Sequence, residues 1–332
     1  MGSRDLPRFL DVCYRGYWSF TTFQRSLAAC PSVMIWDDHD IRDGWGSQGD
    51  EHVYRDSHFV TFRNAFIAHQ FIRGPRRWSD ELAPDTASMW QAFAIGGVPF
   101  FVTDQRTNRD VTVPTVMGEA QWQVLRSWFA ALDPARSKYY VLVSSVPVFY
   151  RVANRANIAS AFSSEARDDL LDTWTSQQNE PEWLRLVEEI AKAGARGLRG
   201  IVVSGDYHIS SLCRVTMTLP GQAARPVAYE LITSGFAQEE YGGWKQKVAR
   251  KGWFIETPIE AAGSSLTCEF GIIESIPNFG ALEFDGDQVR ASMFQSTGAG
   301  CVQYRVPLQW EGKVEGLSGL VSSGKVPLET AR

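Results

Sequence analysis

The sequence predicts an α/β fold in a single domain that spans residues 1–332. Apolar runs typical of buried strands alternate with amphipathic helix patterns along the first two-thirds of the chain, as expected for strands placed side by side and covered by helices. The last third, residues 213–310, is a succession of short strand-like runs and is expected to be mainly β. No linker rich in proline and glycine separates the two parts, so we expect the C-terminal part to complete the same domain.

The N-terminal elements are predicted from aromatic spacing and from the residues that end each pattern. Aromatic side chains recur at helical spacing over residues 7–30, and Pro31 ends this helix because proline cannot continue it. Residues 32–36, which are apolar from Val33 to Trp36, then indicate a buried strand. Asp56 is a candidate N-cap for a helix that ends at Gly74.

The central elements alternate strictly between strand and helix. One helix carries apolar residues at positions i, i+3, i+7 and i+10 from Trp122, and another begins at Pro181 and ends at Gly194. Residues 151–170 are polar and are expected to cross the surface. The three strands are continuous apolar runs, as buried parallel strands usually are, at residues 98–104, 138–146 and 200–204.

The C-terminal part contains six strand-like runs. A turn signal, Asp285-Gly286, lies between two of them and predicts a β-hairpin. The runs cover residues 213–219, 227–233, 269–274, 279–284, 288–294 and 301–306.

Composition and charge exclude several classes of protein. Hydrophobic residues make up 44% of the chain, which supports a sizeable core. The formal net charge of −5 offers no basic patch for nucleic acid. We predict no membrane association, because no apolar run approaches the ~18 residues of a membrane helix. The first residues do not resemble a signal peptide, and the five cysteines form no CxxC pair, so we predict a cytoplasmic protein and leave its oligomeric state open.

Two acidic clusters that contain histidine follow predicted strands. Asp37, Asp38 and His39 follow the run 32–36, and Asp206 and His208 follow the run 200–204. Crowded carboxylates repel one another unless a cation neutralises them, and sites in α/β sheets form at the carboxyl ends of strands. We therefore expect the two clusters to converge on a divalent metal ion, with Ca, Fe, Mn and Zn as candidates for this oxygen and imidazole ligand set.

Ordinary structural roles are the alternative for each of these residues. A histidine at a strand end is most often only a hydrogen-bonded polar group, and an aspartate pair is most often a turn or a helix cap. The chain has only five histidines, however, and two of them fall in the two acidic clusters. This coincidence favours the metal site. If Asp206-Tyr207-His208 stays extended, the side chains of Asp206 and His208 leave the backbone on the same side.

Five motifs together resemble those of the PhoD-like alkaline phosphatases (alkaline phosphatase D), a branch of the calcineurin-like metallophosphoesterases. Trp36-Asp37-Asp38-His39-Asp40 is similar to the family's WDDHE/D signature, and the other four occur in family order around it over roughly residues 10–235. These four are Tyr14-Arg15, Thr103-Asp104-Gln105-Arg106 with Arg109, Gly118-Glu119-Ala120-Gln121-Trp122 with Leu125, and Ser204-Gly205-Asp206-Tyr207-His208.

The resemblance implies a layered α/β/β/α sandwich and a centre of two metal ions that hydrolyses phosphate monoesters or diesters with metal-activated water. It assigns Asp38, Asp206 and His208 as metal ligands and makes Asp37 a ligand or a neighbour that orients one. His39 matches the histidine that contacts phosphate or protonates the leaving oxygen.

Two arginines past a predicted strand end are candidates for substrate binding. Arg106 and Arg109 could hold the equatorial phosphate oxygens with their forked guanidinium groups. A structural salt bridge is the alternative role for both.

One departure from the family pattern limits the functional prediction. No GDxxY-type strand end, which supplies early metal ligands in the family, precedes Tyr14. We therefore expect either an N-terminally truncated metallophosphatase or a chain whose remaining ligands come from elsewhere. The competing hypotheses are a catalytically inactive remnant that serves as a binding module and a different metal hydrolase, such as an amidase or a lactonase.

Overall fold

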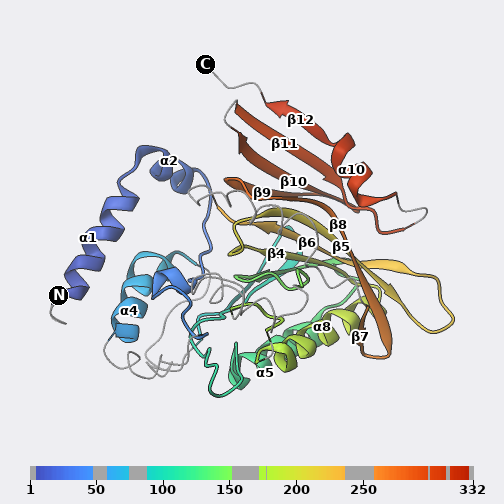
Figure 1. Ribbon diagram of the computed structural model, residues 1–332, viewed down its shortest axis with the longest axis horizontal. Helices are drawn as coiled ribbons and strands as arrows, with labels where there is room; N and C mark the ends of the chain where they lie inside the picture. Colours follow the sequence, from blue (N-terminus) through green and yellow to red (C-terminus); the bar gives the residue numbers. More distant parts are fainter. Residues whose placement is uncertain are drawn as a thin grey trace, which may run out of the picture.

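A computed structural model describes residues 5–47, 58–74, 88–151, 172–176, 178–235, 258–297, 300–311 and 315–328 (Figure 1). These residues form a mixed α/β fold around an eight-stranded and a four-stranded sheet. The strand order is β1-β2-β3-β4-β6-β5-β8-β7 in the large sheet and β12-β11-β10-β9 in the small one. No helix within the described ranges is both long enough and apolar enough to cross a bilayer.

The centre of the large sheet is parallel and its flanks are antiparallel. Strands β2, β3, β4 and β6 run in the same direction, whereas β1, β5, β7 and β8 pair antiparallel with their neighbours. The strands of this sheet are β1 (Gln91–Ile95), β2 (Val98–Val102), β3 (Tyr139–Ser144), β4 (Arg199–Ser204), β5 (Ser210–Thr218), β6 (Arg225–Thr233), β7 (Ile259–Ala261) and β8 (Ser264–Glu274).

The two faces of the large sheet are covered by different layers. Helices α5 (Glu119–Ala131) and α8 (Glu180–Ala195) lie along one face, and the small sheet stacks on the other (Figure 1). Neighbouring residues of one strand therefore reach different cores: Tyr140 and Leu142 pack towards the helices, and Val141 packs towards the small sheet. The small sheet consists of β9 (Asn278–Asp285), β10 (Gln288–Thr297), β11 (Gly300–Pro307) and β12 (Lys325–Leu328), and α10 (Leu317–Ser323) packs against its core.

Most predicted elements are found in the structure. The predicted strands 98–104, 138–146 and 200–204 correspond to β2, β3 and β4, and the two central helices correspond to α5 and α8. The predicted hairpin joins β9 to β10 through a two-residue turn in which Gly286 has φ 57°. The predicted surface segment lies almost wholly outside the described residues, as does Asp56.

The predicted helix over residues 7–30 is two helices. α1 (Leu6–Trp18) and α2 (Thr21–Ala29) are separated at Ser19 and Phe20. The Ser19 hydroxyl donates to the Gly16 carbonyl at 2.6 Å, and this local bond competes with continuation of the helix. Phe20 then has extended dihedral angles.

The predicted strand over residues 32–36 is wrong, because this segment joins neither sheet. The backbone carbonyl of Met34 instead accepts a hydrogen bond of 2.7 Å from the Gln91 side chain. Trp36 is buried against Phe59 and Phe66 of the α4 region, where α4 spans Val60–His69 and is followed by the short helix η3 (Phe71–Arg73). The apolar run therefore packs against the α4 region without becoming a strand of either sheet.

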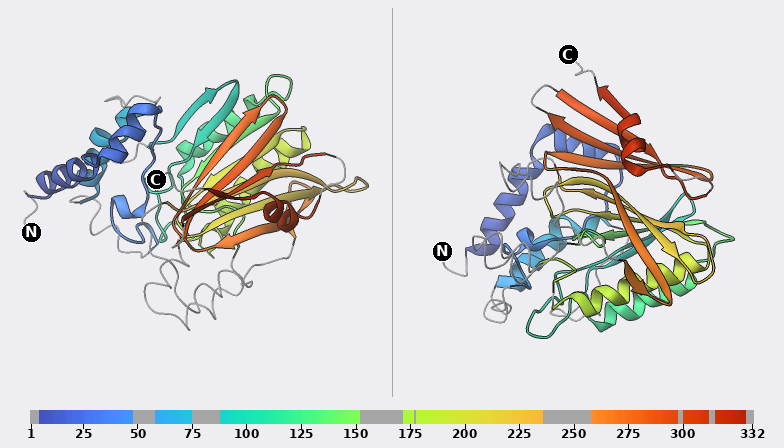
Figure 2. Two further views of the ribbon diagram at one scale, coloured as in Figure 1. Left: turned by 90° about the horizontal axis from the view of Figure 1, so that it is seen from above. Right: turned by 45° about the vertical axis from the view of Figure 1, so that its right-hand side comes forward.

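Strand β1 was missed although the sequence carries its signal. Gly96-Gly97 forms a two-residue turn with φ 57° and 83°, and Ile95 pairs with Val98 across it. A Gly-Gly pair between apolar runs is typical of such a hairpin. β1 lies at the edge of the large sheet, close to the end where α1, α2 and α4 gather (Figure 2).

Candidate metal centre

The acidic signature forms a single tight turn beside the carboxyl ends of β2 and β4. Asp37 precedes a three-residue 3₁₀ helix, η1 (Asp38–Asp40). The Asp40 carboxylate closes this turn by accepting from the Asp37 backbone N–H at 3.0 Å. It also accepts from the Tyr14 hydroxyl at 3.3 Å and from the Gln70 amide at 3.1 Å. Tyr14 and Asp40 thus join α1 to the signature turn.

A buried carboxylate, Asp104, ties the signature to the sheet. It follows β2 and accepts from the Trp36 indole at 2.9 Å and from the Met89 backbone at 2.6 Å. The Gln121 amide group completes the anchor: it accepts from the Asp104 backbone N–H at 2.8 Å and donates to the Asp104 carbonyl at 2.7 Å. Helix α5, strand β2 and the signature are therefore held in one hydrogen-bonded frame.

Arg106 lies at the middle of the acidic cluster with its side chain 0% exposed. Its Nε donates to Asp37 at 2.5 Å, and its two terminal nitrogens donate to the two oxygens of Asp172 at 2.7 Å each. The same guanidinium lies 3.6 Å from Asp38 and 4.0 Å from Asp206. One buried cation is thus shared by four carboxylates.

Arg109 adds a second buried cation. It pairs with Asp172 at 3.0 Å and donates to the Asp172 carbonyl at 2.5 Å. Gly46, with φ 92°, makes room for it: a Cβ on Gly46 would lie 2.4 Å from the Arg109 Cγ. Two guanidiniums face four carboxylates in this set, so it retains two negative charges when all six groups are ionised.

Asp206 enters the cluster from a strained turn. It follows β4 with φ 67°, and the Tyr207 N–H donates to the Gly205 carbonyl at 2.8 Å across it. Left-handed backbone at a residue other than glycine costs roughly 1–3 kcal/mol and collects at functional sites. The surrounding structure holds this conformation and thereby aims the carboxylate at Asp37 and Asp38.

The pKa values of the carboxylates separate into two kinds. Burial raises the pKa of Asp37 to about 6 against the opposing charge of Arg106, while Asp38 and Asp172 add to the increase. Burial and then the charge of Asp37 raise the pKa of Asp206 well above its ordinary range. Burial also acts to raise the pKa of Asp172, but the charges of Arg106 and Arg109 outweigh burial, so the pKa of Asp172 is lowered. The arginines therefore stabilise Asp172 and leave Asp37 and Asp206 short of positive charge.

The inner acidic group, Asp37, Asp38 and Asp206, has the donor set of a divalent-cation site. One oxygen from each residue lies within 4.8 Å of the others. This spacing is close to that of oxygens that share one Ca²⁺ at about 2.3–2.6 Å, so small side-chain movements would let one ion contact all three. The Oδ1 atom of Asp38 is buried and lacks a hydrogen-bond donor, whereas its Oδ2 accepts from the Gly44 N–H at 2.8 Å. A bound cation would give the Oδ1 atom of Asp38 the partner that it lacks.

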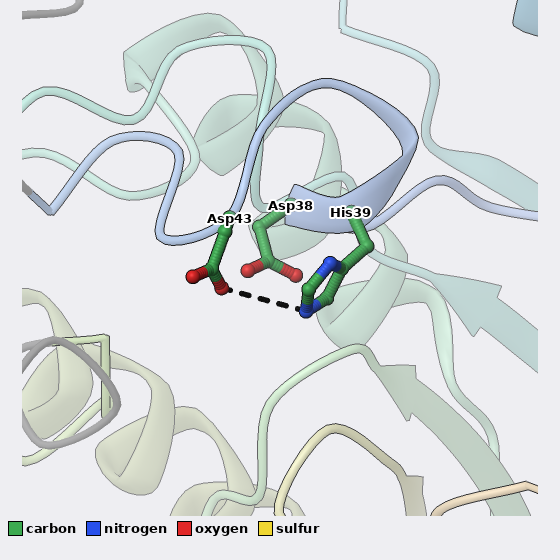
Figure 3. A group of neighbouring side chains, drawn as sticks. All are labelled: Asp38, His39 and Asp43. Atoms are coloured by element: carbon green, nitrogen blue, oxygen red, sulfur yellow. Dashed lines mark ion pairs between the residues drawn. The ribbon is translucent and has the colours of Figure 1, made fainter. Parts of the chain in front are cut away.

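The outer acidic group, Asp38, His39 and Asp43, shares Asp38 with the inner group. The His39 Nε2 lies 3.4 Å from an Asp43 oxygen, and Figure 3 shows the imidazole and both carboxylates on one side of the turn. The His39 side chain is 74% exposed. An incoming ligand can therefore reach this group.

The comparisons with known proteins agree with the arrangement of these motifs. Residues 12–262 match the family described as PhoD-like phosphatase. The chain belongs to the PhoD-like phosphatase family.

Two solved structures and one curated relative show how far the likeness extends. A structure of PhoD matches this chain with a TM-score of 0.61 and 15% identity, covering 96% of this PhoD-like chain and 59% of that one, which shows a shared fold. The uncharacterized protein YGR266W of Saccharomyces cerevisiae is 22% identical over 269 residues, covering 63% of this chain and 38% of the yeast protein. Purple acid phosphatase PPD1 from yellow lupin gives a TM-score of only 0.36 at 11% identity over 66% of this chain and 32% of its own. The chain spans less than two thirds of each of these proteins.

The PhoD-like chain brings together some of the predicted site residues and separates others. Asp37, Asp38 and Asp206 lie together, whereas His208 belongs to neither acidic group among the described residues. The extended geometry considered for Asp206-Tyr207-His208 is wrong, because Asp206 and His208 both have positive φ, of 67° and 51°. The assignment of His208 as a metal ligand stays a prediction.

Two residues of the site were not predicted from the sequence. Asp172 binds both arginines but follows a long polar stretch with no motif around it. Asp43 lies in the Gly- and Asp-rich segment after the signature, and its position four residues after His39 was one signal that it could pair with the imidazole. Arg106 was predicted to bind substrate, yet its guanidinium donates to Asp37, to Asp172 and to the Trp45 carbonyl within the protein.

Proposed function

We propose that this chain hydrolyses phosphate esters, monoesters or diesters, at a divalent-metal centre built on Asp37, Asp38 and Asp206. The observation that carries the proposal is the convergence of these carboxylates, from segments about 170 residues apart, around an unsatisfied Asp38 oxygen. A bound divalent cation would act there as a Lewis acid, which would lower the pKa of bound water toward about 7 and neutralise phosphoryl oxygens. Membership of a phosphatase family supports the same chemistry.

The residues of this chain have separate tasks in the proposed reaction. Asp37, Asp38 and Asp206 hold the cation, and Arg106 keeps the Asp37 carboxylate in place through its Nε. His39 stands in the exposed outer group and delivers a proton to the leaving oxygen, a contribution worth roughly 10²–10⁴-fold in rate. Asp43 accepts a hydrogen bond from the protonated His39 imidazole and thereby holds the ring in the orientation needed to protonate the leaving oxygen.

A binding module without catalysis is the second candidate function. Arg106 already lies within 4.0 Å of the three inner carboxylates and of Asp172, which gives the cluster partial charge compensation without any ion. In that case the chain would bind a phosphate ester or a protein and turn nothing over.

Metal reconstitution distinguishes the two functions. The purified chain is stripped with a chelator, reloaded with Mn, Zn, Ca or Fe, and assayed with p-nitrophenyl phosphate and bis-p-nitrophenyl phosphate, and elemental analysis counts ions per chain. We expect bound metal and metal-dependent turnover, both lost in Asp206→Asn and both kept in Asp287→Asn, a surface aspartate paired with Lys138. The absence of bound metal and of turnover with every ion would reject the proposed hydrolase.

A further inference from the structure

An aromatic groove opens beside the signature turn. It has a volume of about 720 Å³, a size typical of small-molecule sites. The end of α1 and the start of α2 supply Tyr17, Trp18, Phe20 and Phe23, and the signature turn supplies His39 and Asp40. Helices α1, α2 and α4 gather at one side of the molecule (Figure 2), and α4 adds Phe62 to the groove lining.

We propose that this groove binds the apolar, alcohol-derived part of the substrate while its phosphate lies at the metal centre. The assignment rests on the proposed function, and it names the substrate class as phosphate esters of hydrophobic alcohols. His39 connects the two places. It lines the groove and is adjacent in the chain to Asp38, with Cα atoms about 3.8 Å apart.

The position of the leaving oxygen determines where the carbon chain of the alcohol lies. If His39 protonates the leaving oxygen, the carbon chain attached to that oxygen must start next to the imidazole. His39 lines the groove, so a long alcohol that starts beside this residue can extend along the aromatic wall rather than into solvent. Burial of each methylene then increases affinity by roughly fourfold.

The aromatic wall is exposed in a way that the fold itself does not require. Tyr17 is 69% exposed and Phe20 is 61% exposed, and neither belongs to a buried core cluster of the described residues. Adjacent aromatic side chains left open to water mark interaction surfaces more often than single exposed hydrophobic residues do. The ring of Trp18 packs at 5.0 Å from that of Phe23, which gives the wall a fixed part.

The polar side of the groove disfavours a second anionic group. The Tyr14 hydroxyl donates to Asp40, and the Gln70 amide donates to both of them, so their hydrogen bonds are met within the protein. The Asp40 carboxylate would repel a second phosphate. An apolar group therefore fits this groove better than the charged end of a polyphosphate does.

Alkylphosphonates test the groove without any need for turnover, because their C–P bond is not hydrolysed. Binding of octylphosphonate and ethylphosphonate to the metal-loaded chain is measured by calorimetry. We expect octylphosphonate to bind at least about tenfold more tightly, and this preference to disappear in Phe20→Ala and in Tyr17→Ser. Both side chains are largely exposed, so their removal leaves the core intact.

A matched control is Phe279→Ala in the small sheet, where Phe279 is 38% exposed and stacks on Phe294. This variant should keep the preference for the octyl ligand. Equal binding of the two phosphonates, or a preference that survives both groove substitutions, overturns the proposal. Concentration-dependent dimerisation that Phe20→Ala abolishes would also overturn it, because the groove would then bind a second copy.

A parallel assay separates failure of the groove from failure of the hydrolase. The kcat/KM for octyl phosphate and ethyl phosphate, whose hydrolysis releases the alcohol and inorganic phosphate, is compared in the same variants by phosphate release, and we expect the octyl ester to be favoured at least about tenfold in the unaltered chain and in Phe279→Ala, but not in the two groove variants. Turnover without chain-length preference would reject the groove and keep the hydrolase. Octyl-selective binding with no turnover of any ester would reject the groove as a substrate site together with the hydrolase.

Discussion

The inner and outer acidic groups share Asp38 but stand in opposite environments. The inner group lies against Arg106, whose side chain is 0% exposed, whereas His39 of the outer group is 74% exposed. Burial raises the pKa of Asp37 and Asp206 in the inner group, and this makes a cation most valuable there. The outer group remains accessible to a ligand.

This difference indicates a division of labour between holding and reacting. A charge that must stay in one place is best enclosed, because low polarity strengthens its interactions and fixes its partners. A proton donor must meet the substrate, so it benefits from exposure. Asp38 joins the two tasks because its Oδ2 is fixed by the Gly44 N–H while its Oδ1 has no donor.

Replacement of Arg106 should have the largest effect. In Arg106→Met, the carboxylates of Asp37, Asp38, Asp172 and Asp206 lose their shared cation, and we expect the free energy of unfolding to fall by about 3–5 kcal/mol. Urea denaturation measures the change. Arg305→Met, which removes a surface pair with Glu283, is the control and should cost no more than ~1 kcal/mol. Equal losses in both variants would show that the inner group does not depend on its buried cation.

Replacement of Asp38 should come next, because both acidic groups depend on it. We expect Asp38→Asn to weaken metal binding by more than about 100-fold, beyond the range seen for residues that only orient a ligand. Asp43→Asn should weaken it by less than about tenfold, since Asp43 belongs to the exposed group alone. Metal titration followed by elemental analysis checks both values, and a similar loss in the two variants would remove the distinction between the groups.

His39 should separate chemistry from metal binding. We expect His39→Ala to lower kcat by roughly 10²–10⁴-fold while the number of bound ions stays the same. Steady-state kinetics and elemental analysis of one preparation give both quantities. Loss of metal in proportion to activity would instead make His39 a ligand.

A change of pH should have the smallest effect. Whether it raises or lowers the free energy of unfolding should depend on whether metal is bound. The folded-state pKa of Asp37 is raised from 3.8 to about 6, so its contribution to stability is fully present below pH 3.8 and is lost as the pH rises through 6. In the metal-stripped chain, we expect the free energy of unfolding to decrease by roughly 1–3 kcal/mol over this window. Urea denaturation at several pH values should show a weaker dependence in Asp37→Asn. Metal-loaded protein should show the reverse trend, because a cation holds the carboxylates ionised.

The prediction of the fold succeeded where local pattern and burial coincide. β3 and β4 are continuous apolar strands buried on both faces, and this pattern is typical of a central strand. α5 and α8 each have one apolar side, and this pattern is typical of a helix that covers a core. Residues 33–36 are also apolar, but Met34, Ile35 and Trp36 pack in the cluster around Phe59 and Phe66 and form no strand. A short apolar run indicates that the segment is buried, but it does not indicate which element buries it.

Residue type and order were enough to predict the family, the alternation of strands and helices, and the acidic signature. The three-dimensional fold was needed to show that Arg106 serves as counter-charge for four aspartates, that Asp172 belongs to the site, and that His208 lies outside the inner group. The physical reason is that charge compensation and side-chain direction depend on distances between segments 60 residues or more apart. Those distances are fixed by the packing of whole strands and helices, and no local pattern encodes them.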